Sequence, residues 1–229
     1  MGRPSDTKAE QELYREIRRA VGERRLLPGT KLTEESLAEL FGVSRARVRK
    51  VLLLLSKDKI VQLVANRGAY VWKPTVEEAR NVLSARKLVE THLVSEAASR
   101  ATSRQIAQLR AIAAQEAEAK LGNDTARMMR LSGDFHMKLA ECASNPILEE
   151  FLATLMSRSY LILAAYQVHN SHNCPQDDHT RIADRIEARD SAGAVQELEV
   201  HFGHIEAELN LRGDEPEEKT NLGKILRRN

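Results

Sequence analysis

The sequence predicts a mainly α-helical protein, and three observations support this fold class. Only 4% of the 229 residues are aromatic, and glycine (11) and proline (6) are sparse, which disfavours all-β folds with many strands and turns. Apolar residues recur at helical spacing along most of the chain. Only two short segments, 60–64 and 69–72, have the composition of strands.

The first 73 residues have the pattern of three helices followed by a hairpin. Thr33 can cap the second helix and Ser44 the third, because both precede apolar stripes of helical spacing. The expected elements are helices over 9–25, 34–41 and 45–57, strands over 60–64 and 69–72, and a turn at 66–68. This order is the outline of a winged helix-turn-helix.

Beyond Pro74 the chain is expected to be helical throughout. About six helices are expected, over 75–100, 104–120, 125–143, 146–169, 175–189 and 191–211. Helices of this number and length can bury a core of their own as a bundle. We therefore expect an N-terminal domain over 1–73, a helical domain over 74–213, and a charged, flexible tail over 214–229.

Charge is unevenly distributed between the two expected domains. Residues 1–73 hold 16 Lys or Arg against 9 Asp or Glu, whereas residues 74–229 hold 19 against 24. A basic N-terminal domain on an acidic body indicates that the first domain meets a polyanion. A chance division between solvated faces is the alternative.

The third expected helix has the basic pattern of a helix that reads DNA. It begins Ser44-Arg-Ala-Arg-Val-Arg-Lys50, with the cations in its first two turns and Val48 and Val51 facing the core. In a recognition helix the N-terminal residues reach bases and phosphates, and arginine can bond guanine through O6 and N7 together. A solvated basic surface is the alternative. The candidate DNA-contacting residues are Thr33, Ser44, Arg45, Arg47, Arg49, Lys50, Arg67 and Gly68.

Other features argue against membrane insertion and a disulfide framework. The longest apolar run, 160–166, is far shorter than the roughly 20 residues of a membrane span. Residues 1–12 have no apolar signal core, and Cys142 and Cys174 form no CxxC pair. We expect a reduced, cytoplasmic protein with no membrane partner.

Two long segments of the N-terminal domain resemble a known family. Residues 27–50 (Leu-Pro-Gly-Thr-Lys-Leu-Thr-Glu-Glu-Ser-Leu-Ala-Glu-Leu-Phe-Gly-Val-Ser-Arg-Ala-Arg-Val-Arg-Lys) and 66–71 (Asn-Arg-Gly-Ala-Tyr-Val) resemble the GntR family of bacterial transcription regulators. The body resembles the FCD ligand-binding domain of its FadR-like branch. The matching pieces are Arg86-Lys-Leu-Val-Glu90, Phe135-His136, Ser144-Asn145-Pro146, Asp178-His179 and His201.

This resemblance covers about residues 9–212 and implies a function. It implies a homodimer on a near-palindromic operator, which a small carboxylate effector causes the protein either to release or to bind again. A repressor is the leading hypothesis. Two positions depart from the family pattern. Arg47 stands where Pro, Thr or Ser is usual, and Lys50 where Glu is usual. Both changes add positive charge to the recognition helix, so the operator sequence is not implied by the resemblance.

The resemblance also implies a metal site formed by His136, His179 and His201. No local spacing such as HExxH joins these histidines, and a lone histidine on an apolar stripe is more often a core or surface residue. FCD domains that bind metal also have an aspartate one turn before the first histidine, where this chain has Ser132. Asp134 is at i−2 and is expected to point away. Three neutral imidazoles suit zinc or nickel.

An anionic effector requires a cation in the helical domain. Arg86 lies on an apolar helix face, and the resemblance implies that it lines the effector cavity. An internal ion pair with Glu90 at i+4 is the alternative. The candidate effector-binding residues are Arg86, Ser132, Tyr160 and His204.

Two other functions compete with a regulator. A metal-dependent hydrolase would use the three histidines to activate water. However, the chain has no HExxH, GxSxG or P-loop pattern, and an enzyme leaves the basic domain unexplained. An architectural DNA-binding protein without a sensor leaves the histidines and Arg86 unexplained. The sequence therefore favours a regulator that is not an enzyme.

Overall fold

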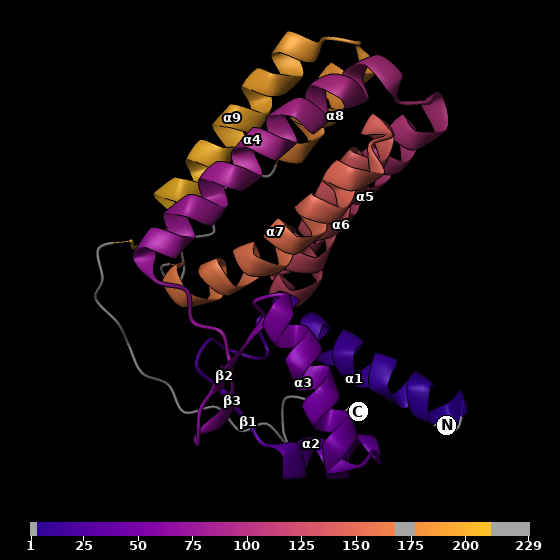
Figure 1. Ribbon diagram of the computed structural model, residues 1–229. Helices are drawn as coiled ribbons and strands as arrows, with labels where there is room; N and C mark the ends of the chain where they lie inside the picture. Colours follow the sequence, from indigo (N-terminus) through magenta and orange to yellow (C-terminus); the bar gives the residue numbers. More distant parts are fainter. Residues whose placement is uncertain (1–3, 168–176, 212–229) are drawn as a thin grey trace. The chain divides into compact units, whose positions relative to one another are not determined.

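The computed structural model describes residues 4–167 and 177–211, and it is mainly helical, as expected (Figure 1). The described helices are α1 (Pro4–Gly22), α2 (Glu34–Phe41), α3 (Arg45–Lys57), α4 (Val76–Arg100), α5 (Ser103–Leu121), α6 (Thr125–Ala143), α7 (Pro146–Tyr166), α8 (Asp178–Glu187) and α9 (Ser191–Ala207). The strands are β1 (Lys31–Leu32), β2 (Val61–Val64) and β3 (Gly68–Val71). No helix in these described ranges has the length and apolar character needed to cross a membrane.

The described chain divides into two compact units. The first contains residues 4–75 together with 160–165, and the second contains 76–159, 166–167 and 177–211. The short segment 160–165 belongs to the first unit although it is distant in sequence, which the pattern of helices did not indicate. The expected tail, 214–229, lies outside the described residues.

The first unit contains a three-stranded antiparallel sheet in the order β1-β3-β2. The expected hairpin is present, with Val61 opposite Val71 and Val64 opposite Gly68. Its turn needs two left-handed residues, Asn66 (φ 61°) and Gly68 (φ 96°), which asparagine and glycine tolerate best. β1 was not expected, because two residues are too short to show an alternating pattern. It forms by pairing with the free edge of β3.

The helix-turn-helix is formed by α2, a left-handed turn at Gly42 (φ 63°), and α3. Thr33 caps α2 by accepting a hydrogen bond from the backbone N–H of Ser36, as expected. Ser44 occupies the N-cap position of α3 but makes no side-chain capping bond, which corrects the expected cap. The core of the unit is apolar and buried. It includes Leu13, Ile17, Val48, Leu52, Leu55, Trp72 and Leu161.

The six helices expected beyond Pro74 are all present, and they lie in the second unit except for residues 160–165 of α7. Within this unit α4 packs against α6 and α9, while α5 packs against α6 and α8, and α8 against α9. Phe135 of α6 and Phe202 of α9 are its largest fully buried side chains. Some expected boundaries were wrong. Thr102, not Ser103, caps α5 through a reciprocal box with Gln105, and α9 ends at Ala207 rather than near 211.

Two neighbouring leucines of α3 provide a matched test of the first core. Leu55 is fully buried, whereas Leu53 is 50% exposed. We expect Leu55→Ala to lower the free energy of unfolding by about 2–5 kcal/mol, because it leaves a cavity. Leu53→Ala should change it by less than about 0.5 kcal/mol. The measurement is denaturant unfolding followed by the fluorescence of Trp72, which is the single tryptophan and lies in this unit. Equal losses for the two variants would contradict this core.

Candidate nucleic-acid interface and histidine cluster

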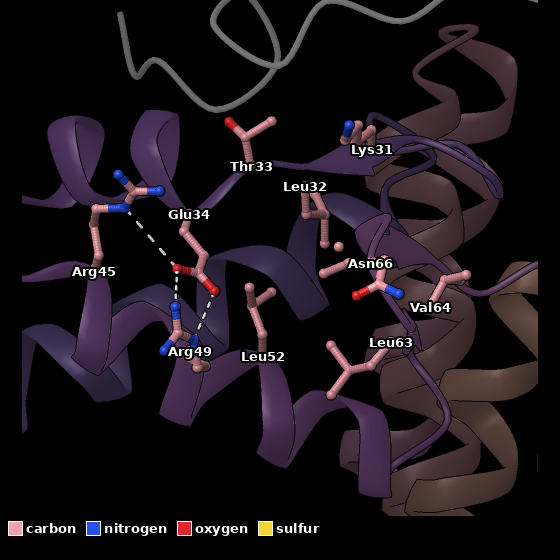
Figure 2. A pocket seen from close by; sticks show the side chains of 12 residues that line it. Lys31, Leu32, Thr33, Glu34, Arg45, Arg49, Leu52, Leu63, Val64 and Asn66 are labelled. Atoms are coloured by element: carbon pink, nitrogen blue, oxygen red, sulfur yellow. Dashed lines mark hydrogen bonds and ion pairs between the residues drawn. The ribbon is translucent and has the colours of Figure 1, made fainter.

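Two arginines of the recognition helix are held by one carboxylate of α2. Arg49 donates from Nε and from Nη2 to the two carboxylate oxygens of Glu34, each at 2.8 Å. Nε of Arg45 lies 4.0 Å from the same carboxylate. Figure 2 shows both arginines directed toward Glu34 from α3. Both arginine side chains are more than half exposed, so they remain accessible to a partner.

A groove of about 510 Å³ lies between α3 and the strands of the wing. Four candidate DNA-contacting residues line it, namely Thr33, Arg45, Arg49 and Gly68. Lys31 and Asn66 lie on the wing side of the same groove, as Figure 2 shows. Exposed arginines at the start of α3 beside a hairpin are the arrangement that a winged helix presents to a DNA groove. Arg67 is exposed at the tip of the hairpin, and Ser44 is exposed directly before α3.

Two further cations near the start of α3 have a different partner. Nη1 of Arg47 lies 3.4 Å from Oε1 of Glu10, and Nζ of Lys50 donates to Oε2 of the same residue at 2.7 Å. Glu10 belongs to α1, so these cations join α3 to α1. The two departures from the family pattern are therefore matched by one acidic residue within the chain. Their proposed contact with DNA stays a prediction.

Three histidines of the second unit come together from three helices. His136 of α6, His179 of α8 and His201 of α9 are all buried, and one ring nitrogen of each lies within 4.8 Å of the others. Nε2 of His136 and Nε2 of His179 are 3.3 Å apart. The ring of Phe135 stacks on His179 with centroids 4.3 Å apart, which fixes the plane of that imidazole.

A carboxylate lies beside Nδ1 of each of these rings. Oε2 of Glu90 (α4) is 2.5 Å from Nδ1 of His136, and Oε2 of Glu116 (α5) is 2.5 Å from Nδ1 of His179. Asp178 (α8) contacts Nδ1 of His201 at 3.3 Å and Nδ1 of His204 at 2.8 Å. A neutral ring that carries its proton on Nδ1 presents the lone pair of Nε2. The carboxylates thus favour Nε2 as the ligand atom.

The electrostatics of the cluster favour neutral rings. Burial lowers the pKa of His136 to about 4 and that of His201 to about 3, because an imidazolium is poorly solvated there. Contact with Glu90 or Asp178 opposes this shift without reversing it. Burial by itself would raise the pKa of Glu90. The charge of Arg86, together with the contact of His136, overcomes that effect and lowers the pKa of Glu90 to about 2.

Arg86 forms the internal ion pair that was the alternative in the sequence. Its Nε donates to Oε1 of Glu90 one turn along α4, and both side chains are buried. Its guanidinium also lies over the ring of Phe202, 5.2 Å from the centroid. The Nη2 atom is buried and has no hydrogen-bond partner among the described residues. The ion pair therefore leaves donors of Arg86 available to an anion.

The donor set fits a first-row divalent ion. Zinc binds imidazole at about 2.0–2.1 Å, so two nitrogens of a tetrahedral site lie roughly 3.3 Å apart. The separation between His136 and His179 matches this spacing. Ser132, one turn before His136, is half-buried and offers no carboxylate, whereas Asp134 is exposed and pairs with Arg130 at 2.9 Å. Three imidazoles would thus hold the ion and leave coordination positions open.

The structure also corrects the candidate effector site. Tyr160 lies in the first unit and packs against its apolar core, so it does not join the histidine cluster. His204 does adjoin the cluster, through Asp178. Glu116 had no signal in the sequence, because 63 positions separate it from His179. Asp178 was indicated in the sequence only as the residue directly before His179, in a piece that resembles the FCD domain.

Comparison with known proteins identifies both parts of the chain. The family described as "Bacterial regulatory proteins, gntR family" matches residues 9–71, and the family described as "FCD domain" matches residues 81–204. The HTH-type transcriptional repressor NanR of Klebsiella aerogenes is 31% identical over 223 residues, covering 86% of this chain and 82% of the relative. NanR of Salmonella newport is 30% identical over 228 residues, covering 89% and 85%.

Solved structures share the fold at lower identity. E. coli McbR/YncC has a TM-score of 0.77 and 18% identity, and the match covers 87% of this chain and 95% of that one. A putative transcriptional regulator GntR from Rhodococcus sp. RHA1 has a TM-score of 0.75 and 22% identity, covering 86% and 95%. The matched ranges contain the helix-turn-helix, the wing and the histidine cluster. The chain therefore belongs to the gntR family of bacterial transcription regulators and has a C-terminal FCD domain.

Proposed function

We propose that this DNA-binding regulator is a homodimeric, cytoplasmic repressor whose operator affinity depends on a small carboxylate and a divalent metal. The proposal of repression comes from the similar NanR proteins, which are named as repressors. The observation that carries the proposed sensing is the buried cluster of three imidazoles beside a partly unsatisfied arginine. A homodimer is supported by the way in which helix-turn-helix proteins bind two half-sites.

DNA recognition is assigned to the groove between α3 and the wing. Arg45 is exposed there, near the N-terminus of the recognition helix. A bidentate contact with guanine would specify a base, whereas Arg67 at the hairpin tip is placed for the minor groove or the backbone.

Arg45→Ala should weaken binding to the preferred duplex by about 1–3 kcal/mol and relax its sequence preference. Arg104→Ala is the control, because it removes the same charge from an exposed position on α5. The preferred duplex is first selected by the full chain from random-sequence duplexes, and the affinities are measured by fluorescence anisotropy. A dimer should select two inverted half-sites about one helical turn apart. Equal losses of affinity for the two variants would mean that Arg45 contributes only its charge and does not recognise a base.

The histidine cluster is suited to a divalent cation in its charge as well as its donors. Glu90, Glu116 and Asp178 surround the rings, Arg86 supplies one buried positive charge, and Arg181 pairs with Asp178. A cation bound to the rings would offset the excess negative charge. An effector carboxylate could coordinate such an ion, and Arg86 would supply hydrogen-bond donors beside it.

The proposed control of DNA binding is a shift between two populations. The cluster and its carboxylates involve five helices, α4, α5, α6, α8 and α9. A ligand that binds one arrangement of these helices more tightly favours that arrangement. The spacing of the two recognition helices in a dimer would change with it, and so would the fit to two half-sites.

The alternative of a metal-dependent hydrolase has less support. Each carboxylate near the histidines contacts a ring nitrogen, and Glu90 and Asp178 also contact arginines. These contacts favour an orienting role over that of a general base for water.

Glu116→Gln should weaken binding of zinc or nickel by about 10- to 100-fold, because the ring of His179 loses its anionic partner. Glu118→Gln is the matched control on the same helix, since this side chain is 71% exposed. The measurement is calorimetry of each metal into chelator-treated protein, with metal stoichiometry from elemental analysis. Wild-type protein that binds neither metal would overturn the proposed metal site. Unchanged affinity in Glu116→Gln would overturn the role of Glu116.

Arg86→Lys should weaken effector binding by about tenfold or more, because lysine keeps the charge near Glu90 but loses the planar fork. A panel of small carboxylates is titrated into zinc-loaded and zinc-free protein by calorimetry. Binding of an acid only with metal would support shared coordination. Tight binding that is indifferent to Arg86→Lys would contradict the proposed role of this arginine.

A further inference from the structure

Glu34 is an acidic residue on the surface that must approach a polyanion. It is the first residue of α2 and lines the groove between α3 and the wing (Figure 2). A carboxylate placed there repels phosphates, so its presence in a DNA interface requires an explanation. An exposed ion pair contributes little to folding stability, and the arginine partners of Glu34 are 71% and 66% exposed.

The geometry of the pair with Arg49 indicates which donors remain available. A guanidinium has five N–H donors. Glu34 accepts from Nε and from one hydrogen of Nη2, which is the side edge of the fork. The end edge, formed by Nη1 and the other Nη2 hydrogen, matches the O6 and N7 acceptors of guanine. Arg49 can therefore hold Glu34 and a guanine at the same time.

Glu34 is itself well anchored. Thr33 caps α2 directly before it, with its hydroxyl oxygen accepting from the backbone N–H of Ser36. The hydrogen bond from Arg49 lowers the pKa of Glu34, so the carboxylate stays ionised near neutral pH. A long, exposed arginine would otherwise sample many rotamers, and a bidentate contact restricts them.

We propose that Glu34 is a positioning residue for operator recognition, which orients Arg49, and more loosely Arg45, toward bases and disfavours their contact with phosphates. A phosphate that approached the side edge of Arg49 would meet the Glu34 carboxylate. A guanine at the end edge would not. Glu34 therefore weakens binding to unselected DNA more than binding to the operator, which raises sequence discrimination.

Glu10 supplies a matched control on the same recognition helix. It also contacts two cations of α3, Arg47 and Lys50, but from α1 and away from the groove with the wing. Glu10→Gln and Glu34→Gln remove the same charge. A general electrostatic effect would therefore change both variants alike, whereas a positioning effect would distinguish them.

The test uses full-length protein, the duplex that wild-type protein selects from random sequences, and an unselected duplex of the same length. For Glu34→Gln we expect the ratio of the two affinities to fall at least about fivefold, which is the lower limit for losing one bidentate base contact. Affinity for the unselected duplex should be equal or higher. For Glu10→Gln both affinities should change in parallel, with the ratio unchanged.

A double-mutant cycle tests whether Glu34 acts through Arg49. In an Arg49→Lys background, Glu34→Gln should have little further effect on the ratio, because the fork is already absent. Binding to the unselected duplex and the fluorescence of Trp72 report that each variant is folded. If Glu34→Gln does not fold, Glu34→Asp takes its place, since the shorter side chain keeps the charge and withdraws it from the fork. Three results would overturn the proposal. The first is an affinity ratio that does not change in the Glu34 variant. The others are a fall in the ratio for Glu10→Gln as large as that for Glu34→Gln, and a fall caused by Glu34→Gln that is as large in the Arg49→Lys background as in wild-type protein.

Discussion

The second unit depends on a buried carboxylate, Glu90, which stays ionised only because of its partners. Glu90 is fully buried between Arg86 of its own helix and His136 of α6. Burial disfavours its charge, and the two partners restore it. Removing one partner of such a buried pair typically destabilises a protein by about 3–5 kcal/mol, because a charge is left uncompensated. The contact therefore constrains where α4 and α6 lie, and with them the first ring of the histidine cluster.

The same constraint extends to the other two rings. His179 and His201 each have a carboxylate at Nδ1, from Glu116 and Asp178. A carboxylate lies beside Nδ1 of each imidazole, so the three Nε2 edges are left for one another and for a ligand. Four helices besides α6 contribute to this arrangement, so a ligand bound at the cluster would contact a site that joins five helices of the unit.

The recognition helix satisfies three requirements at once. Its buried face, with Val48, Leu52 and Leu55, belongs to the core of the first unit. A second side carries Arg47 and Lys50 toward Glu10 of α1, and a third carries Arg45 and Arg49 toward Glu34 and the wing. These four cations look equivalent in the sequence, but in the structure they form two pairs, one beside Glu34 and the other beside Glu10. The chemistry of each pair follows from its acidic partner rather than from its own residue type.

The sequence by itself determined most of the secondary structure. Helical periodicity, the hairpin turn at 66–68 and the helix break at Gly42 are local properties, and each appears in the structure where it was expected. Thr33 acted as the expected cap, whereas Ser44 and Ser103 did not, because capping depends on side-chain orientation as well as position. The strand β1 was missed, since its two residues are held by pairing with β3 and by no pattern of their own.

Only the tertiary structure decided which side chains meet. Histidines 136, 179 and 201 were selected by resemblance, but their Nδ1 partners come from residues up to 63 positions away, a separation on which periodicity carries no information. Tyr160 was assigned to the wrong unit for the same reason. Glu34 and Glu10 were ordinary helix-surface acids in the sequence. Packing of α2 and α1 against α3 gave each of them two cations, because an ion pair is defined by distance in space and not along the chain.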